Sequence, residues 1–167
     1  MEHEYRIELS KRRLEIAHER MNTAGILLGA GDYKAVANRL YYAVFSAMRA
    51  VLALDGFDSK KHSGIIARFR QSYIKTGIFS TEMSKIIDDL EVIREDSDYD
   101  DFYIISKEDV KIQSQKAEHF ISEVEKYLEN IIINHRTVAP FIRERLFFDY
   151  YLKCIKSITS KALTNFM

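Results

Sequence analysis

The clearest chemical feature of this 167-residue chain is an uneven distribution of charge. The segment Lys60–Thr76 holds five basic side chains and no acidic one, whereas Glu82–Asp101 holds nine acidic residues against Lys85 and Arg94. One interpretation is a basic surface for phosphate groups beside an acidic surface for a partner. The other is a pair of solvated helix surfaces, or two surfaces that pair in a dimer. The net charge of zero therefore hides a local separation of charge.

His62 lies within the basic segment, directly after Lys61 and before Ser63 and Gly64. A histidine among cations can bind a phosphate or carry a proton near neutral pH. A residue at this place can equally do no more than cap a helix, and the sequence leaves both interpretations open.

Other familiar kinds of catalytic or metal site do not fit this sequence. The single cysteine, Cys154, excludes a cysteine-based zinc site within one chain, and the remaining histidines lack ligand spacing. The run that begins at Asp96 resembles a calcium loop, but Asp101 and Lys107 occupy the positions that need glycine and glutamate. Neither a phosphate-binding glycine loop nor a nucleophile elbow is present. We therefore expect no metal, no cofactor and no self-contained metabolic enzyme.

The segments that carry these residues are predicted to be helices. Only six glycines and one proline interrupt the chain, and apolar residues recur every three or four positions. The predicted helices run from about Glu4 to Leu28, from Asp32 as cap to Leu54, from Lys61 to Ile74, from Ser80 or Thr81 to Arg94, and from Ser106 as cap through Leu128. An acidic connection is predicted at Glu95–Asp101. The fold class is therefore all-α, an antiparallel bundle of about five helices.

The end of the chain differs in character from the bundle. Pro140 marks a possible helix start, and Phe141, Phe147, Tyr150 and Tyr151 follow it closely. We expect residues 1–134 to form the bundle and residues 135–167 to add a C-terminal helix to the same domain. The N-terminus is not a signal peptide and no segment is apolar enough to span a membrane, so a cytoplasmic location is expected.

Several segments together resemble one known family. The second predicted helix contains Ala37-Asn-Arg-Leu-Tyr-Tyr-Ala-Val-Phe45, which is similar to the A-x-R-x-Y-Y-A-x-F pattern of prokaryotic HEPN proteins. The K-x-H-S-G turn of that subgroup is matched by Lys61–Gly64, its next segment by Tyr73–Gly77, and its R-x-x-A-D-Y ending by Arg94 and Ser97–Asp100. The resemblance covers about residues 10–130.

The resemblance implies a dimeric helical bundle that works beside a minimal nucleotidyltransferase, often in a toxin–antitoxin or defence system. It implies that Arg39, Tyr42, Lys61, His62 and Arg94 contact a nucleotide or RNA. Many relatives are metal-independent ribonucleases that use an arginine followed four to six residues later by a histidine. In this sequence Tyr99, Asp100 and Asp101 stand at those distances from Arg94.

Three functions therefore remain open at this stage. The first is a HEPN binding module, homodimeric and without a membrane partner, with Tyr99 as a candidate for modification by the nucleotidyltransferase. The second is a ribonuclease toxin with a variant site, whose catalytic candidates are Arg94, Tyr99 and His62; it predicts that Arg94, Tyr42 and His62 converge in space. The third is a structural helical interaction protein without a ligand. Acidic neighbours should raise the pKa of Tyr99, which makes it a poor general base.

Overall fold

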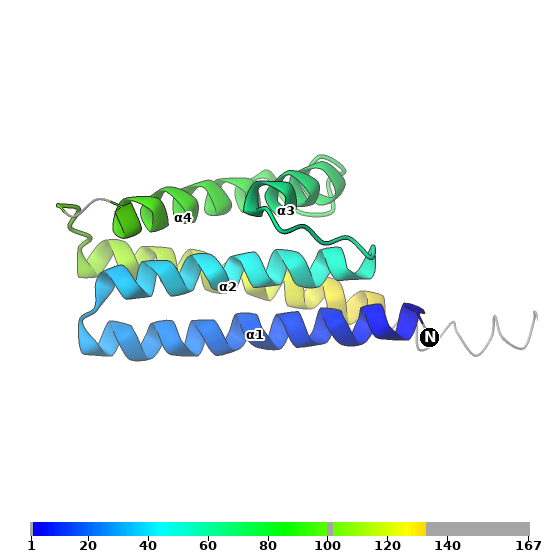
Figure 1. Ribbon diagram of the computed structural model, residues 1–167, viewed down its shortest axis with the longest axis horizontal. Coiled ribbons are helices and arrows are strands. Elements are labelled where there is room, and N and C mark those ends of the chain that lie inside the picture. Colours follow the sequence, from blue (N-terminus) through cyan, green and yellow to red (C-terminus); the bar gives the residue numbers. More distant parts are fainter. Residues whose placement is uncertain (1, 100–101, 133–167) are drawn as a thin grey trace, which may run out of the picture. The chain divides into compact units, whose positions relative to one another are not determined.

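The computed structural model describes residues 2–99 and 102–132. Its elements are α1 (Glu2–Ala30), α2 (Tyr33–Leu54), α3 (His62–Phe69), a π-helical turn η1 (Arg70–Ile74) and α4 (Thr81–Tyr99), and a further helix occupies residues 107–132. No strand occurs in these two ranges. The predicted all-α class is confirmed (Figure 1).

The chain divides into a compact unit, Met1–Leu128, and a second unit, Glu129–Met167. The bundle and its candidate site belong to the first unit. The predicted C-terminal helix at 135–167 lies outside the described residues, and so does the aromatic group that begins at Phe141.

The first two helices form an antiparallel hairpin, joined by a tight turn (Figure 1). Gly31 takes a positive φ of 81° and its N–H reaches the Leu28 carbonyl, which ends α1. The helix therefore continues to Ala30, slightly beyond its predicted end at Leu28. Asp32 then caps α2 as predicted, because its side chain accepts a hydrogen bond of 3.1 Å from the backbone N–H of Ala35.

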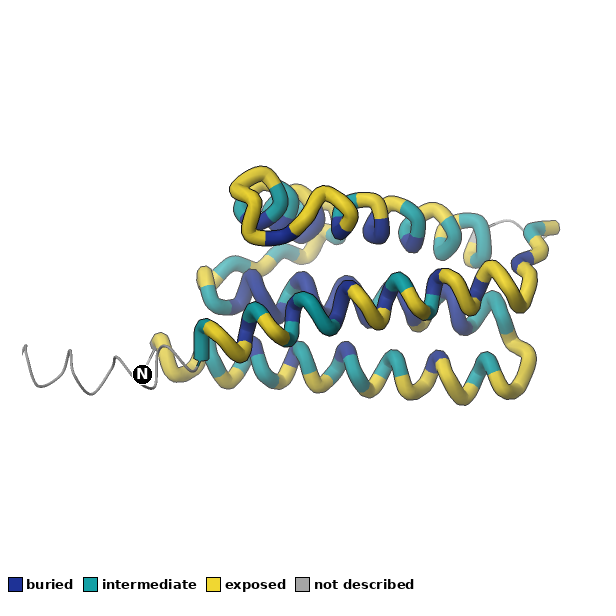
Figure 2. The backbone as a smooth tube through the Cα atoms, turned by 180° about the vertical axis from the view of Figure 1, so that it is seen from behind, coloured by how far each residue is buried: buried dark blue, intermediate teal, exposed yellow. Residues whose placement is uncertain are grey.

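Helix α2 lies at the centre of the unit. Other helices contact it on different sides, so residues all along it are buried rather than one stripe alone (Figure 2). Leu40, Met48 and Leu52 are fully buried, and each contributes roughly 1.5–3 kcal/mol by leaving water. A helix held in this way is a rigid platform for the polar side chains along its edges.

The third predicted helix is confirmed in its extent but not in its regularity. It begins as α3 and then widens into η1, where the N–H of Lys75 reaches the Arg70 carbonyl. Phe69 and Tyr73 stack across this change of helix type, with ring centroids 5.6 Å apart. Phe69 also packs on Phe120 of the 107–132 helix, which ties this segment to the core.

The acidic connection predicted at Glu95–Asp101 is wrong for most of its length, because α4 continues to Tyr99. Arg94 and Asp98 are one turn apart on this helix and form an ion pair of 2.9 Å, which stabilises the extra turn. Ser106 caps the next helix as predicted, since its hydroxyl accepts a hydrogen bond from the Asp109 N–H.

Candidate functional site

Three elements bring a histidine, two tyrosines and an arginine together. His62 begins α3 and lies between side chains of α2: its ring centroid is 4.2 Å from that of Phe45 and 5.8 Å from that of Tyr42. The Tyr41 hydroxyl is 3.0 Å from His62 Nδ1. We call His62, Phe45, Tyr42 and Tyr41, together with Arg94 of α4, the aromatic–cation cluster.

Arg94 reaches this cluster from α4. Its guanidinium carbon lies 5.5 Å from the ring centroid of Tyr41 and 6.0 Å from that of Tyr42, within range of a cation–π interaction. Its Nε is 2.9 Å from Asp98, whose carboxylate also accepts hydrogen bonds from the Asn38 amide. The Arg94 side chain is only 15% exposed. Arg94 is therefore held in a defined orientation against the aromatic rings.

The cluster favours a neutral histidine. Burial lowers the pKa of His62 below its usual value, and the positive charges of Arg94 and Arg49 lower it further. Burial also raises the pKa of Tyr41 to about 12, with the nearby Glu91 acting in the same direction. At neutral pH an uncharged imidazole thus faces a protonated phenol, and its Nε2 takes no part in that hydrogen bond.

His62 also lines a cavity of 510 Å³. It is lined by Phe45 and Arg49 of α2 and by residues 58–60, which lead into α3. Asp58 fastens this segment to the helical hairpin: one carboxylate oxygen is 2.6 Å from Arg13 and 2.8 Å from Arg49. Burial alone would raise the pKa of Asp58, but its hydrogen bonds from Arg49 and from the Ser59 N–H lower it.

There is no space for a side chain at Gly64, two positions after His62. A Cβ at Gly64 would lie 2.6 Å from the Ser59 hydroxyl oxygen and 3.2 Å from Ser59 Cβ. The same hydroxyl accepts a hydrogen bond from the Lys61 N–H. The absence of a side chain at Gly64 therefore lets the Ser59 turn close against α3 and bring His62 toward α2.

The structure brings together three of the residues singled out from the sequence, namely Arg94, Tyr42 and His62. Lys61 is exposed and stands as the N-cap residue of α3. Tyr99 is the last residue of α4, and its side chain is outside the described part of the structure.

Arg39 is exposed on α2, near enough to Arg20 to lower the pKa of Arg20, which burial lowers most. Arg20 itself lies 5.5 Å from the Tyr42 ring and donates a hydrogen bond of 2.7 Å to the Tyr42 carbonyl. Tyr42 therefore has guanidinium groups of Arg20 and Arg94 near its ring.

Sequence reasoning missed Tyr41, Phe45, Arg49 and Arg20 as members or neighbours of the site. Tyr41 and Phe45 stand within the A-x-R-x-Y-Y-A-x-F pattern, which is a signal that could have identified them. Arg20 and Arg49 have no such signal, since only packing of α1 on α2 and the turn of Asp58 give them their places.

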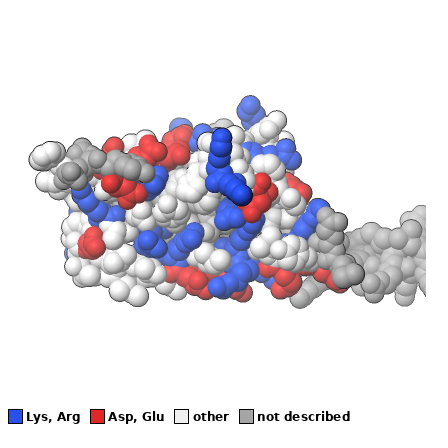
Figure 3. All heavy atoms as spheres, viewed as in Figure 1, with Lys and Arg blue, Asp and Glu red and all other residues white. Residues whose placement is uncertain are grey.

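Charged side chains are unevenly distributed over the surface of the protein. Lys and Arg side chains gather across the middle of the face shown, and Asp and Glu side chains crowd near the end of α4 (Figure 3). The basic segment Lys60–Thr76 and the acidic segment Glu82–Asp101 also meet, because Arg70 and Asp88 form an ion pair of 2.5 Å.

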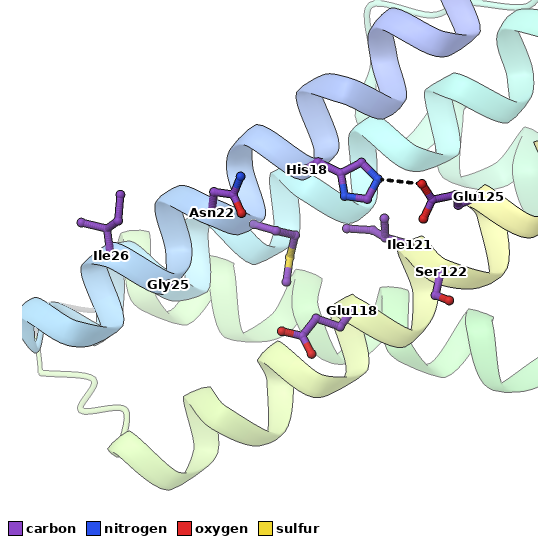
Figure 4. A pocket seen from close by; sticks show the side chains of 9 residues that line it. His18, Asn22, Gly25, Ile26, Glu118, Ile121, Ser122 and Glu125 are labelled. Atoms are coloured by element: carbon purple, nitrogen blue, oxygen red, sulfur yellow. Dashed lines mark ion pairs between the residues drawn. The ribbon is translucent and has the colours of Figure 1, made fainter.

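A second hollow, of 650 Å³, lies between α1 and the 107–132 helix. Figure 4 shows His18 of α1 pointing across it toward Glu125, with 3.4 Å between Nε2 and the carboxylate. Glu118 and Glu125 line it, and none of its described lining residues is a Lys or Arg. Its charge is unsuited to a phosphate ligand, so the aromatic–cation cluster is the better candidate site.

Neither a metal centre nor a bilayer-spanning helix is found among residues 2–99 and 102–132. No group of three or more potential metal ligands gathers there. No helix in those ranges combines the length and the apolar character that crossing a membrane requires.

The structure is that of an all-α protein in which Arg94 of α4 and His62 of α3 both lie against tyrosines of α2. Comparison with known proteins identifies the family. The HEPN domain model matches residues 10–127, and the chain belongs to this family. A UPF0332 protein of Thermotoga maritima is 34% identical over 125 residues, which cover 75% of this chain and 92% of that protein.

Two further relatives are informative. A Methanocaldococcus jannaschii protein named "Putative toxin MJ0142" is 30% identical over 128 residues, which cover 77% of this chain and 86% of that protein. The crystal structure of TT1696 from Thermus thermophilus shares the fold, with a TM-score of 0.60 at 17% identity over 70% of this chain and 96% of that one.

Proposed function

We propose that this HEPN protein binds RNA at the aromatic–cation cluster. The observation that carries the proposal is the convergence of Arg94, Tyr42 and His62 from three separate elements. A guanidinium binds phosphate oxygens, and aromatic faces stack on unpaired bases. An arginine beside the half-buried ring of Tyr42 is thus suited to single-stranded RNA, whose bases are free to stack.

The surroundings of the cluster support this role. Tyr42 is half-buried, so part of its ring remains open to a ligand, and Arg20 lies near the same ring. Lys60 and Lys61 are exposed next to His62 and add positive charge. Acidic residues near the end of α4 oppose a polyanion, but Asp98 is already paired with Arg94 and bonded to Asn38.

A second candidate function is metal-independent RNA cleavage, with His62 in place of the histidine missing after Arg94. The neutral state of His62 favours it, because a neutral imidazole can accept the proton of a ribose 2′-hydroxyl. The freed oxygen would attack the neighbouring phosphorus, the bond to the 5′-oxygen would break, and water would protonate the departing oxygen. Arg94 would stabilise the charge on the phosphoryl oxygens.

We further propose that the protein is a homodimer and works with a minimal nucleotidyltransferase in a toxin–antitoxin-like system. The family resemblance supports the partner, and the names of its relatives support the toxin association. Light scattering of the purified protein tests the dimer, and a monomeric mass at micromolar concentration contradicts it. Incubation with ATP and the nucleotidyltransferase from the neighbouring gene tests the partner, with added mass on Tyr99 as the expected product.

The central experiment measures binding and cleavage of a labelled single-stranded RNA without metal. Wild-type protein should bind with an affinity that falls as salt rises, and Arg94→Ala should weaken binding roughly tenfold, as loss of one charge-assisted contact would. The matched control is Arg12→Ala, which removes an exposed arginine of α1 that pairs with Glu15 and Glu19.

The two functions separate by their products. We expect binding with little cleavage, because Arg94 is not followed by a histidine and Asp98 holds its Nε. Cleavage that disappears in both Arg94→Ala and His62→Ala would instead establish the ribonuclease. Equal binding by wild type and Arg94→Ala would contradict the cluster as the RNA site.

A further inference from the structure

The cavity beside His62 has the chemistry of an anion site that the cluster alone does not provide. Arg49, Lys60 and the Ser59 hydroxyl line its polar side, and Phe45 and His62 form its ring-bearing wall. His62 thus belongs both to the cavity and to the aromatic–cation cluster. The cavity and the cluster are therefore adjacent, and one ligand can contact both.

The one carboxylate in the cavity does not cancel its positive charge. Asp58 is shared between the guanidinium groups of Arg13 and Arg49, at 2.6 Å and 2.8 Å. Two positive charges therefore neighbour one negative charge, and exposed Lys60 adds another positive charge. Arg13 is nearly buried, so this pairing is a fixed part of the structure and leaves a net positive cavity.

Arg49 also retains capacity to donate hydrogen bonds. It holds Asp58 through Nη2, and Nη1 takes no part in that pair. Its Nε is shielded from water and has no hydrogen-bond partner among the described residues. Buried polar groups normally have a hydrogen-bond partner, so this N–H is a donor that the described residues do not satisfy.

We infer that this cavity binds a terminal phosphate of RNA, a phosphate monoester rather than an internal diester. The inference rests on the proposed RNA binding at the adjacent cluster. A monoester carries about two negative charges and three acceptor oxygens, which suits a site with Arg49, Lys60 and a serine hydroxyl. An internal diester carries a single charge and is bonded to a nucleotide on each side, so it would use only part of these donors.

The test compares three forms of one short RNA, with a 5′-phosphate, with a 3′-phosphate and with neither, bound to full-length protein. We expect one phosphorylated form to bind roughly tenfold more tightly than the unphosphorylated form, as an extra charge-assisted contact would give. The phosphorylated form with the higher affinity identifies the end of the RNA that enters the cavity. Lys60→Ala should reduce this preference several-fold, and it should weaken binding of the unphosphorylated RNA by a clearly smaller factor.

The control is Lys85→Ala, which removes an exposed lysine of α4 and should keep the full preference. At constant ionic strength, inorganic phosphate should compete more strongly with the phosphorylated form than with the unphosphorylated one. Equal affinity for all three forms overturns the terminal-phosphate site while RNA binding at the cluster stands. Absence of binding by every form overturns both proposals.

Discussion

The hydroxyl of Tyr41 lies 3.0 Å from Nδ1 of His62, and this contact joins the central helix of the bundle to the first residue of α3. Tyr41 is buried, so its phenol would lose its hydrogen bond to water on folding if His62 were absent. The pair therefore fixes the orientation of the imidazole and leaves its other nitrogen, Nε2, outside this hydrogen bond.

Replacing Tyr41 by phenylalanine tests this bond. The ring packing on Phe45 would remain, and only the hydroxyl would be lost, so we expect the free energy of unfolding to fall by about 1 kcal/mol. Urea denaturation measures the change. If the bond orients His62, the same variant should also weaken RNA binding. Unchanged stability and unchanged binding would show that the hydroxyl does neither.

His62 should titrate below its ordinary pKa of 6.5. Burial is the main cause, and Arg94 contributes, so Arg94→Gln should move the pKa upward toward the ordinary value. Because the folded pKa is lower than the unfolded one, His62 favours the folded state above about pH 6.5. That contribution is lost as the pH falls through the window below 6.5. NMR titration of the imidazole measures both values, and a pKa above 6.5 in the wild type would contradict the cluster's electrostatics.

The Arg13–Asp58 pair should matter more than an exposed ion pair. The Arg13 side chain is 10% exposed, so Asp58→Ala would leave a nearly buried guanidinium without its carboxylate. We expect a loss of about 2 kcal/mol, reduced from the fully buried case because Asp58 is half exposed. Urea midpoints measure it, with Glu15→Ala as the control, since loss of its exposed pair with Arg12 should change the midpoint far less.

Gly64→Ala should destabilise the protein although alanine is the better helix former. The new Cβ would approach the Ser59 hydroxyl to 2.6 Å, which disturbs the turn that carries His62. The matched control is Gly25→Ala in α1, where nothing lies within 4 Å of the added methyl group. That variant should gain up to about 1 kcal/mol. Adding Ser59→Gly to Gly64→Ala should recover stability, and failure to do so would place the strain elsewhere.

Local patterns were sufficient to predict most of the helices. The repeat of apolar residues, Asp32 before α2 and Ser106 before the 107–132 helix are all short-range signals, and each acts through contacts within a turn or two. The acidic end of α4 misled the prediction because its stability comes from an Arg94–Asp98 pair on one helical face and from Asn38 on another helix.

The sequence by itself determined the class of the fold, because apolar periodicity and helix caps are local signals. It also singled out Tyr42, His62 and Arg94 as candidates, each from a short pattern within one segment. Only the tertiary structure decided that they meet. Tyr41 and His62 are 21 positions apart, and Arg13 and Asp58 are 45 apart. Such pairs depend on which helix faces pack together and on how the turn at Gly64 closes. That choice follows from burying the whole core at once, which no single segment encodes.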